Sequence, residues 1–81
     1  MNDKLVHKFL TDRFNITVED CDKLLTGFGY VLNKDGGSHR TYHKKAKFPI
    51  TVVVQKHSRY VKPSYVDLII KNLNLEGING T

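Results

Sequence analysis

Apolar side chains near the start of the chain recur every three or four residues, which is the spacing of one face of a helix. The pattern predicts a first helix over residues 2–12, a break over residues 13–15, and a second helix. The second helix is expected to close at Gly27 or, as we favour, at Gly29 in the left-handed conformation. The apolar stripes of the two helices are Leu5, Val6, Phe9 and Leu10, then Val18, Cys21, Leu25 and Phe28.

The start of the second helix carries a local signal. Thr17 is the expected N-cap, because Asp20 stands three residues later as in a capping box. Ile16 and Cys21 then occupy the two positions of a hydrophobic staple.

From residue 30 the pattern changes to that of strands, with β-branched and aromatic residues between turn signals. We expect a strand over residues 30–34, a hairpin turn at 35–37 and a second strand over 38–44. A turn over 45–48 then leads to a β-branched third strand over 50–55.

A basic loop over residues 56–62 separates the third strand from a last helix. Pro63 and Ser64 are expected to open this helix, and Asp67 stands three residues after Ser64. The tail of residues 77–81 is expected to fray. The apolar stripe of the last helix is Val66, Ile69, Ile70 and Leu73.

The order α-α-β-β-β-α predicts a single α+β domain over residues 1–81, with helices on one face of an antiparallel three-stranded sheet. Strand side chains alternate between faces, and Tyr42, the large side chain of the second strand, is expected to face the helices. Ser38 and Arg40 share its face, whereas His39, Thr41 and His43 share the open face. An exposed histidine held on a strand beside a basic loop is a candidate catalytic group, and His39 is that candidate.

The composition fits one small globular domain. The chain has 81 residues, 40% of them hydrophobic, and no apolar run of the roughly 20 residues that a membrane span needs. The N-terminus lacks the apolar stretch of a secretory signal. The single Cys21 excludes an internal disulfide and suits a reducing compartment, so a cytoplasmic protein is expected.

The positive charge is concentrated in one part of the sequence. Residues 34–62 hold eight basic residues and one acidic residue, whereas the other 52 residues hold five basic and seven acidic ones. Lysines that simply keep a surface solvated are the plain alternative. The confinement of the excess to the part that holds His39 favours a surface that binds a polyanion.

Several short motifs occur in a characteristic order. A helix ends in Gly29-Tyr30, Gly37-Ser38-His39 leads a strand, and Lys62-Pro63 opens the last helix after a third strand. They stand within LLTGFGYVLNKDGGSHRTYH and KHSRYVKPSYVDLIIKNL. In this order and spacing, from about residue 16 to residue 73, the chain resembles the HicA family of bacterial toxins. The loop at 57–61 departs from the family, because many relatives have a glycine there.

The resemblance implies a fold, an activity and a partner. The fold would be like that of double-stranded-RNA-binding domains. The activity would be that of the toxin in a type II toxin–antitoxin system. Such a toxin is an endoribonuclease that cuts messenger RNA and stops translation and growth until a HicB-type antitoxin neutralises it. His39 would carry the catalysis.

Histidine chemistry suits this activity, and no metal or other cofactor is expected. A base that takes the 2′-hydroxyl proton lets that oxygen attack the adjacent phosphate, and histidine is partly neutral at cellular pH. The general acid stays open between His57 in the basic loop, His43, and neither. His43 lies about 13 Å along the strand from His39, which is far for one scissile bond. His7 is expected to be inert, and no pair of histidines has the spacing of a metal signature.

Further residues are expected to contact the RNA. Lys or Arg side chains stabilise the negative charge that develops on phosphate oxygens, and an aromatic ring stacks on a base. Gly37 would let a phosphate approach the backbone closely. The predicted RNA-binding residues are Gly37, Ser38, Arg40, Lys56, Arg59, Tyr60 and Lys62.

Two other functions remain open at this point. A non-catalytic double-stranded-RNA-binding module carries a lysine cluster at the start of its last helix, whereas the cluster here, residues 44–47, precedes the third strand. A pure protein-interaction module would present the basic face to an acidic partner.

Overall fold

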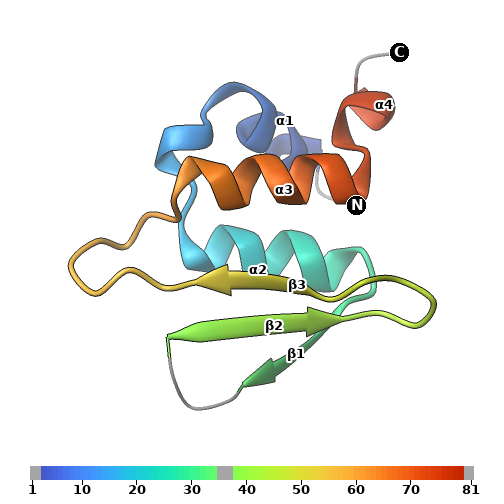
Figure 1. The fold of residues 1–81 in the computed structure, drawn as a ribbon. Helices are drawn as coiled ribbons and strands as arrows, with labels where there is room; N and C mark the ends of the chain where they lie inside the picture. The colour runs from blue at the N-terminus through green and yellow to red at the C-terminus, as the bar shows by residue number, and fades with distance from the viewer. Residues whose placement is uncertain (1–2, 35–37, 80–81) are drawn as a thin grey trace.

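The structure, a computed structural model, describes residues 3–34 and 38–79, and for residues 34, 78 and 79 it describes the backbone alone. The three strands follow one another between two groups of helices, as in an α+β fold, and the helices lie on one side of the three-stranded sheet (Figure 1). The prediction of this coarse fold is confirmed. The elements are α1 Asp3–Thr11, α2 Val18–Gly27, β1 Val31–Lys34, β2 His39–His43, β3 Ile50–Val53, α3 Pro63–Leu73 and α4 Leu75–Asn79.

The sheet is antiparallel with the order β1-β2-β3, so β2 is the central strand. Tyr42 pairs with Leu32 on one side and with Ile50 on the other. These three side chains face the helices, where α2 packs on β1 and α3 packs on β3. The predicted turn at residues 35–37 lies outside the described residues.

The predicted start and end of α2 are confirmed. Thr17 Oγ1 accepts from the Asp20 N–H at 3.1 Å, and Asp20 Oδ2 accepts from the Thr17 N–H at 3.1 Å, which completes the capping box. Gly29 has a φ of 92°, a conformation that costs glycine little because it has no Cβ. An N-cap residue such as Thr17 contributes about 1 kcal/mol to helix stability.

Asp20 also ties α1 to α2. Lys8 Nζ lies 2.8 Å from Asp20 Oδ2. Burial by itself would raise the pKa of Asp20, but the hydrogen bonds from Lys8 and Thr17 outweigh it and lower the pKa. The carboxylate therefore stays charged at neutral pH and holds the two helices together.

The core lies between the sheet and the helices. Ile16 and Cys21, the predicted staple residues, are both fully buried. Burial raises the pKa of the Cys21 thiol to about 12, so this side chain is a packing residue and not a nucleophile. The buried hydrophobic residues are Leu5, Val6, Phe9, Ile16, Cys21, Leu24, Leu25, Tyr30, Tyr42, Ile50, Val52, Val61, Val66, Ile69 and Leu75.

The predicted opening of the last helix is confirmed, because α3 begins at Pro63, followed by Ser64, with Lys62 as its N-cap. Asp67, three residues after Ser64, forms an ion pair with Arg13. The short helix α4 was not predicted. It covers residues 77–79 of the tail expected to fray, while residues 80–81 lie outside the described part.

The remaining boundaries differ by a few residues. The predicted break at residues 13–15 is a short 3-10 helix. The third strand ends at Val53, and beyond it Gln55 Nε2 donates a hydrogen bond to the Tyr60 carbonyl at 2.6 Å. In the described ranges 3–34 and 38–79, no helix is long and apolar enough to span a membrane.

Candidate nucleic-acid interface

His39 is the first residue of β2, and its side chain is exposed. It pairs with Val53 of β3, and the neighbouring Ser38 carbonyl accepts a hydrogen bond from the Val54 N–H at 2.7 Å. The imidazole is therefore carried by a strand that is paired on its β3 side. This is the rigid placement that a catalytic side chain requires.

The open face of the sheet surrounds His39 with small side chains. Thr41 and Thr51 pair across β2 and β3, with 3.3 Å between their hydroxyl oxygens, and Asn33 of β1 pairs with Thr41. At the far end of β2, His43 pairs with Val31. The predicted alternation is confirmed, since His39, Thr41 and His43 share this face.

Arg40 lies on the other face and belongs to a polar network under the sheet. Its Nη2 lies 3.4 Å from Asp22 Oδ1, and its Nε lies 3.4 Å from the Tyr42 hydroxyl oxygen. The Tyr42 hydroxyl in turn donates to Asp22 Oδ1 at 3.0 Å. Arg40 therefore points away from His39, and its ion pair with Asp22 helps to hold β2 on α2.

The predicted basic loop lies at the same end of the sheet as His39, because β3 runs back toward the start of β2 (Figure 1). Lys56, His57, Arg59 and Lys62 are exposed there. Among the described residues, neither Lys56 nor Lys62 forms an ion pair with a carboxylate. Both ammonium groups are therefore free to meet a phosphate.

The loop is held by local hydrogen bonds. The Tyr60 N–H donates to Ser58 Oγ at 3.1 Å, and Tyr60 forms an isolated bridge with Thr17 ahead of α2. The Arg59 guanidinium stacks on the Tyr60 ring, 5.2 Å from its centroid, and donates to the Tyr60 hydroxyl at 3.1 Å. One face of the predicted stacking ring is thus covered by Arg59.

The basic segment seen in the sequence divides into two clusters in space. Lys56, Arg59 and Lys62 are near the His39 end of the sheet, while Lys44, Lys45 and Lys47 lie in the turn between β2 and β3 at the opposite end. Of the predicted RNA-binding residues, Gly37 lies outside the described residues, and Ser38 is exposed beside His39.

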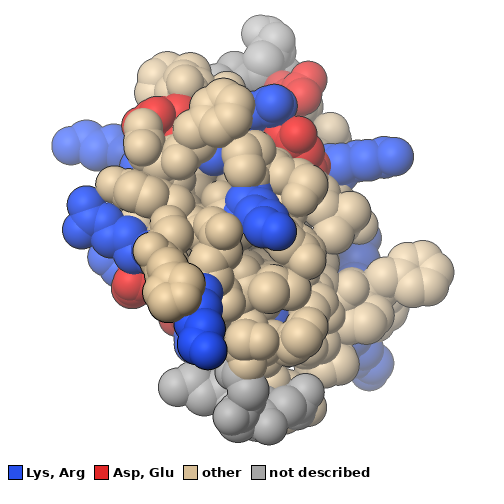
Figure 2. Space-filling model, turned by 60° about the vertical axis from the view of Figure 1, so that its left-hand side comes forward, with Lys and Arg blue, Asp and Glu red and all other residues tan. Residues whose placement is uncertain are grey.

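The acidic side chains are concentrated on the helical side of the molecule. Figure 2 shows the side of the molecule that carries the loop after β3. Most of the acidic side chains visible in this view lie in its upper half, over the helices. Residues 38–62 contain no acidic residue. The ion pairs Lys8–Asp20 and Arg13–Asp67 neutralise charge on the helical side, so the excess positive charge belongs to the sheet and its loops.

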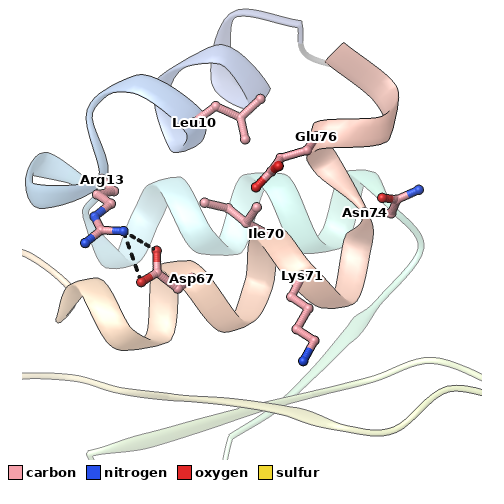
Figure 3. A pocket seen from close by; sticks show the side chains of 7 residues that line it. All are labelled: Leu10, Arg13, Asp67, Ile70, Lys71, Asn74 and Glu76. Carbon is pink, nitrogen blue, oxygen red and sulfur yellow. Dashed lines mark hydrogen bonds and ion pairs between the residues drawn. The ribbon is translucent and has the colours of Figure 1, made fainter. Parts of the chain in front are cut away.

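A cavity of about 550 Å³ lies elsewhere, on the helical side between α1, α3 and α4 (Figure 3). The Arg13–Asp67 ion pair, with a distance of 2.9 Å, stands at its edge. The cavity contains none of the predicted site residues. It is lined by Leu10, Arg13, Asp67, Ile70, Lys71, Asn74 and Glu76.

In the part of the chain that the structure describes, no group of three or more His, Cys, Asp or Glu side chains could hold a metal ion. The chain matches no family model, no curated protein and no solved structure.

Proposed function

We propose that the protein is a metal-independent endoribonuclease of the HicA type, with His39 as the general base. The observation that carries the proposal is the position of His39, exposed on the open face of the sheet at the end where the basic loop begins. The absence of acidic residues from 38–62 supports an anionic substrate at this face.

The chemistry needs few groups. His39 takes the proton of a 2′-hydroxyl, the 2′-oxygen attacks the adjacent phosphorus, and the bond from phosphorus to the 5′-oxygen breaks. The products are a 2′,3′-cyclic phosphate and a 5′-hydroxyl, which gains a proton from a general acid or water. Lys56, Arg59 and Lys62 would stabilise the charge on the phosphate oxygens. His57 in the same loop is a better candidate for the acid than His43, which stands at the far end of β2.

The finer fold and the biological setting are part of this proposal. The order α2-β1-β2-β3-α3, with both helices packed on one face, supports a fold like that of double-stranded-RNA-binding domains. In the cytoplasm the toxin would cut messenger RNA and would be neutralised by a HicB-type antitoxin.

Incubation with single-stranded RNA in EDTA tests the activity. We expect cleavage that leaves 2′,3′-cyclic phosphate ends, because the mechanism uses side chains and the substrate's own hydroxyl. Binding of duplex RNA without cleavage would favour the non-catalytic RNA-binding module instead. Neither binding nor cleavage would favour a protein-interaction module and refute the proposal.

The triple variant Lys56→Ala, Arg59→Ala and Lys62→Ala is expected to bind RNA more weakly and with a flatter salt dependence. Each lost phosphate contact should lower the slope of log K against log salt by about 0.7 for a single strand. The measurement is fluorescence anisotropy of a labelled oligonucleotide over a salt series.

A matched control removes three exposed lysines from the helices, Lys4, Lys23 and Lys71. It lowers the net charge by the same amount and is expected to leave the slope almost unchanged. Equal slopes for the two triple variants would show that the RNA does not contact the loop after β3.

A further inference from the structure

The turn between β2 and β3 presents an aromatic side chain that the fold does not use. Phe48 is 88% exposed, whereas Phe14, the other strongly exposed phenylalanine in the described ranges, is 67% exposed and has the Arg13 guanidinium 5.3 Å from its ring centroid. A chain of this size needs nearly all of its apolar residues for the core. A phenylalanine left in solvent between lysines and a proline is therefore unexpected on packing grounds.

The turn has a defined conformation. The Lys47 N–H donates to the Lys44 carbonyl at 3.1 Å, and Lys44 Nζ donates to the Phe28 carbonyl at 2.6 Å. Lys44 also lies 5.7 Å from the centroid of the Tyr30 ring. These contacts anchor the first residue of the turn to the end of α2.

Ala46 sits in this turn with a φ of 66°, a left-handed conformation that alanine rarely adopts. It costs a residue with a Cβ about 1–2 kcal/mol, and strained residues of this kind cluster at functional sites. Lys45 and Lys47 on either side are exposed, and in the described residues neither forms an ion pair.

The position of the turn relates it to His39. The open face runs along β2 from His39, past Thr41, to His43, and the turn begins at the next residue. This path is about 13 Å long and carries no acidic side chain. A single strand of RNA cut at His39 can lie along it and reach the turn a few nucleotides away.

We propose that this turn is a second contact for single-stranded RNA, in which Phe48 stacks on a base while Lys45 and Lys47 bind the flanking phosphates. Base stacking on an aromatic ring tolerates any sequence, and neighbouring cations hold the backbone. The inference rests on the proposed function, because its ligand is the substrate of His39, and it adds a binding determinant that depends on RNA length.

The test compares Phe48→Ala with the matched control Phe14→Ala on RNA oligonucleotides of about 12 and about 3 nucleotides. Phe48→Ala should weaken binding of the longer RNA by about ten-fold and should leave binding of the shorter RNA unchanged. Phe14→Ala should change the binding of neither RNA. Lys45→Ala with Lys47→Ala should lower the salt slope for the longer RNA only. Since Phe48 is exposed, Phe48→Ala should unfold at the wild-type temperature.

Equal binding of the longer RNA by Phe48→Ala and Phe14→Ala would overturn the inference and leave the ribonuclease proposal intact. So would an equal loss of binding for both RNA lengths. If Phe48→Ala weakens binding of the longer RNA but the wild type never cleaves RNA, the contact at Phe48 stands and the ribonuclease proposal is refuted. No binding of any RNA by the wild type would refute both.

Discussion

Replacement of His39 by alanine is expected to lower RNA cleavage by about 10²–10⁴-fold, the usual contribution of a general base. The side chain is exposed on the open face and makes no core contact. The free energy of unfolding should therefore stay within about 0.5 kcal/mol of wild type. RNA binding should be nearly retained, because the basic side chains remain. Single-turnover cleavage, anisotropy and thermal unfolding measure the three quantities.

Alanine variants of the other two exposed histidines near the sheet complete the comparison, with His43→Ala as the control. His43→Ala should lose little activity, because His43 lies at the opposite end of β2. His57→Ala should lower cleavage if His57 protonates the leaving oxygen, because the 5′-oxygen would then leave without a general acid. Wild-type cleavage by His39→Ala, or its unfolding, would refute the assignment of His39 and make His57 the next candidate.

The parts of the fold that depend on neighbouring residues were predictable from the sequence. The capping box of Thr17 and Asp20 and the left-handed Gly29 each involve groups a few residues apart, so their residue types identify them. Ser64 and Asp67 have the same spacing at the start of α3, but the partner of Asp67 is Arg13, which is distant in sequence and could not be predicted from that spacing.

The helix α4 could not be predicted from periodicity because it is too short to show a repeat. Asn74 closes α3 in the left-handed conformation, with a φ of 52°, and its N–H donates to the Ile70 and Lys71 carbonyls. The chain then turns so that Leu75 is fully buried, where α4 contacts α1. An asparagine one residue after the last apolar position was the available signal.

For the candidate site, alternation along β2 predicted which face each side chain occupies. The alternation could not predict which residues of other elements those side chains contact. Arg40 was expected to contact RNA, and its pair with Asp22 depends on how α2 crosses the sheet. Likewise, residues 44–47 and 56–62 are close in sequence, but an antiparallel connection sends them to opposite ends of the sheet.

Replacement of Tyr42 by alanine is expected to lower the free energy of unfolding by about 3–5 kcal/mol, a large part of the stability of a small domain. Tyr42 is fully buried at the centre of the sheet, between Leu32 and Ile50. Its loss would leave a cavity between the central strand and the helices, and would leave Asp22 without the hydroxyl donor. Denaturant unfolding measures the change.

Tyr42→Phe separates the hydroxyl from the ring. It keeps the packing and removes the hydrogen bond to Asp22, so it should cost only about 1 kcal/mol. Burial raises the pKa of Tyr42 to about 12 from 10.0. A raised pKa in the folded state stabilises the fold fully below pH 10, and this contribution is lost as the pH rises through 12. The stability gap between wild type and Tyr42→Phe should therefore narrow above pH 10. A constant gap over that range would show that burial does not raise the pKa of Tyr42.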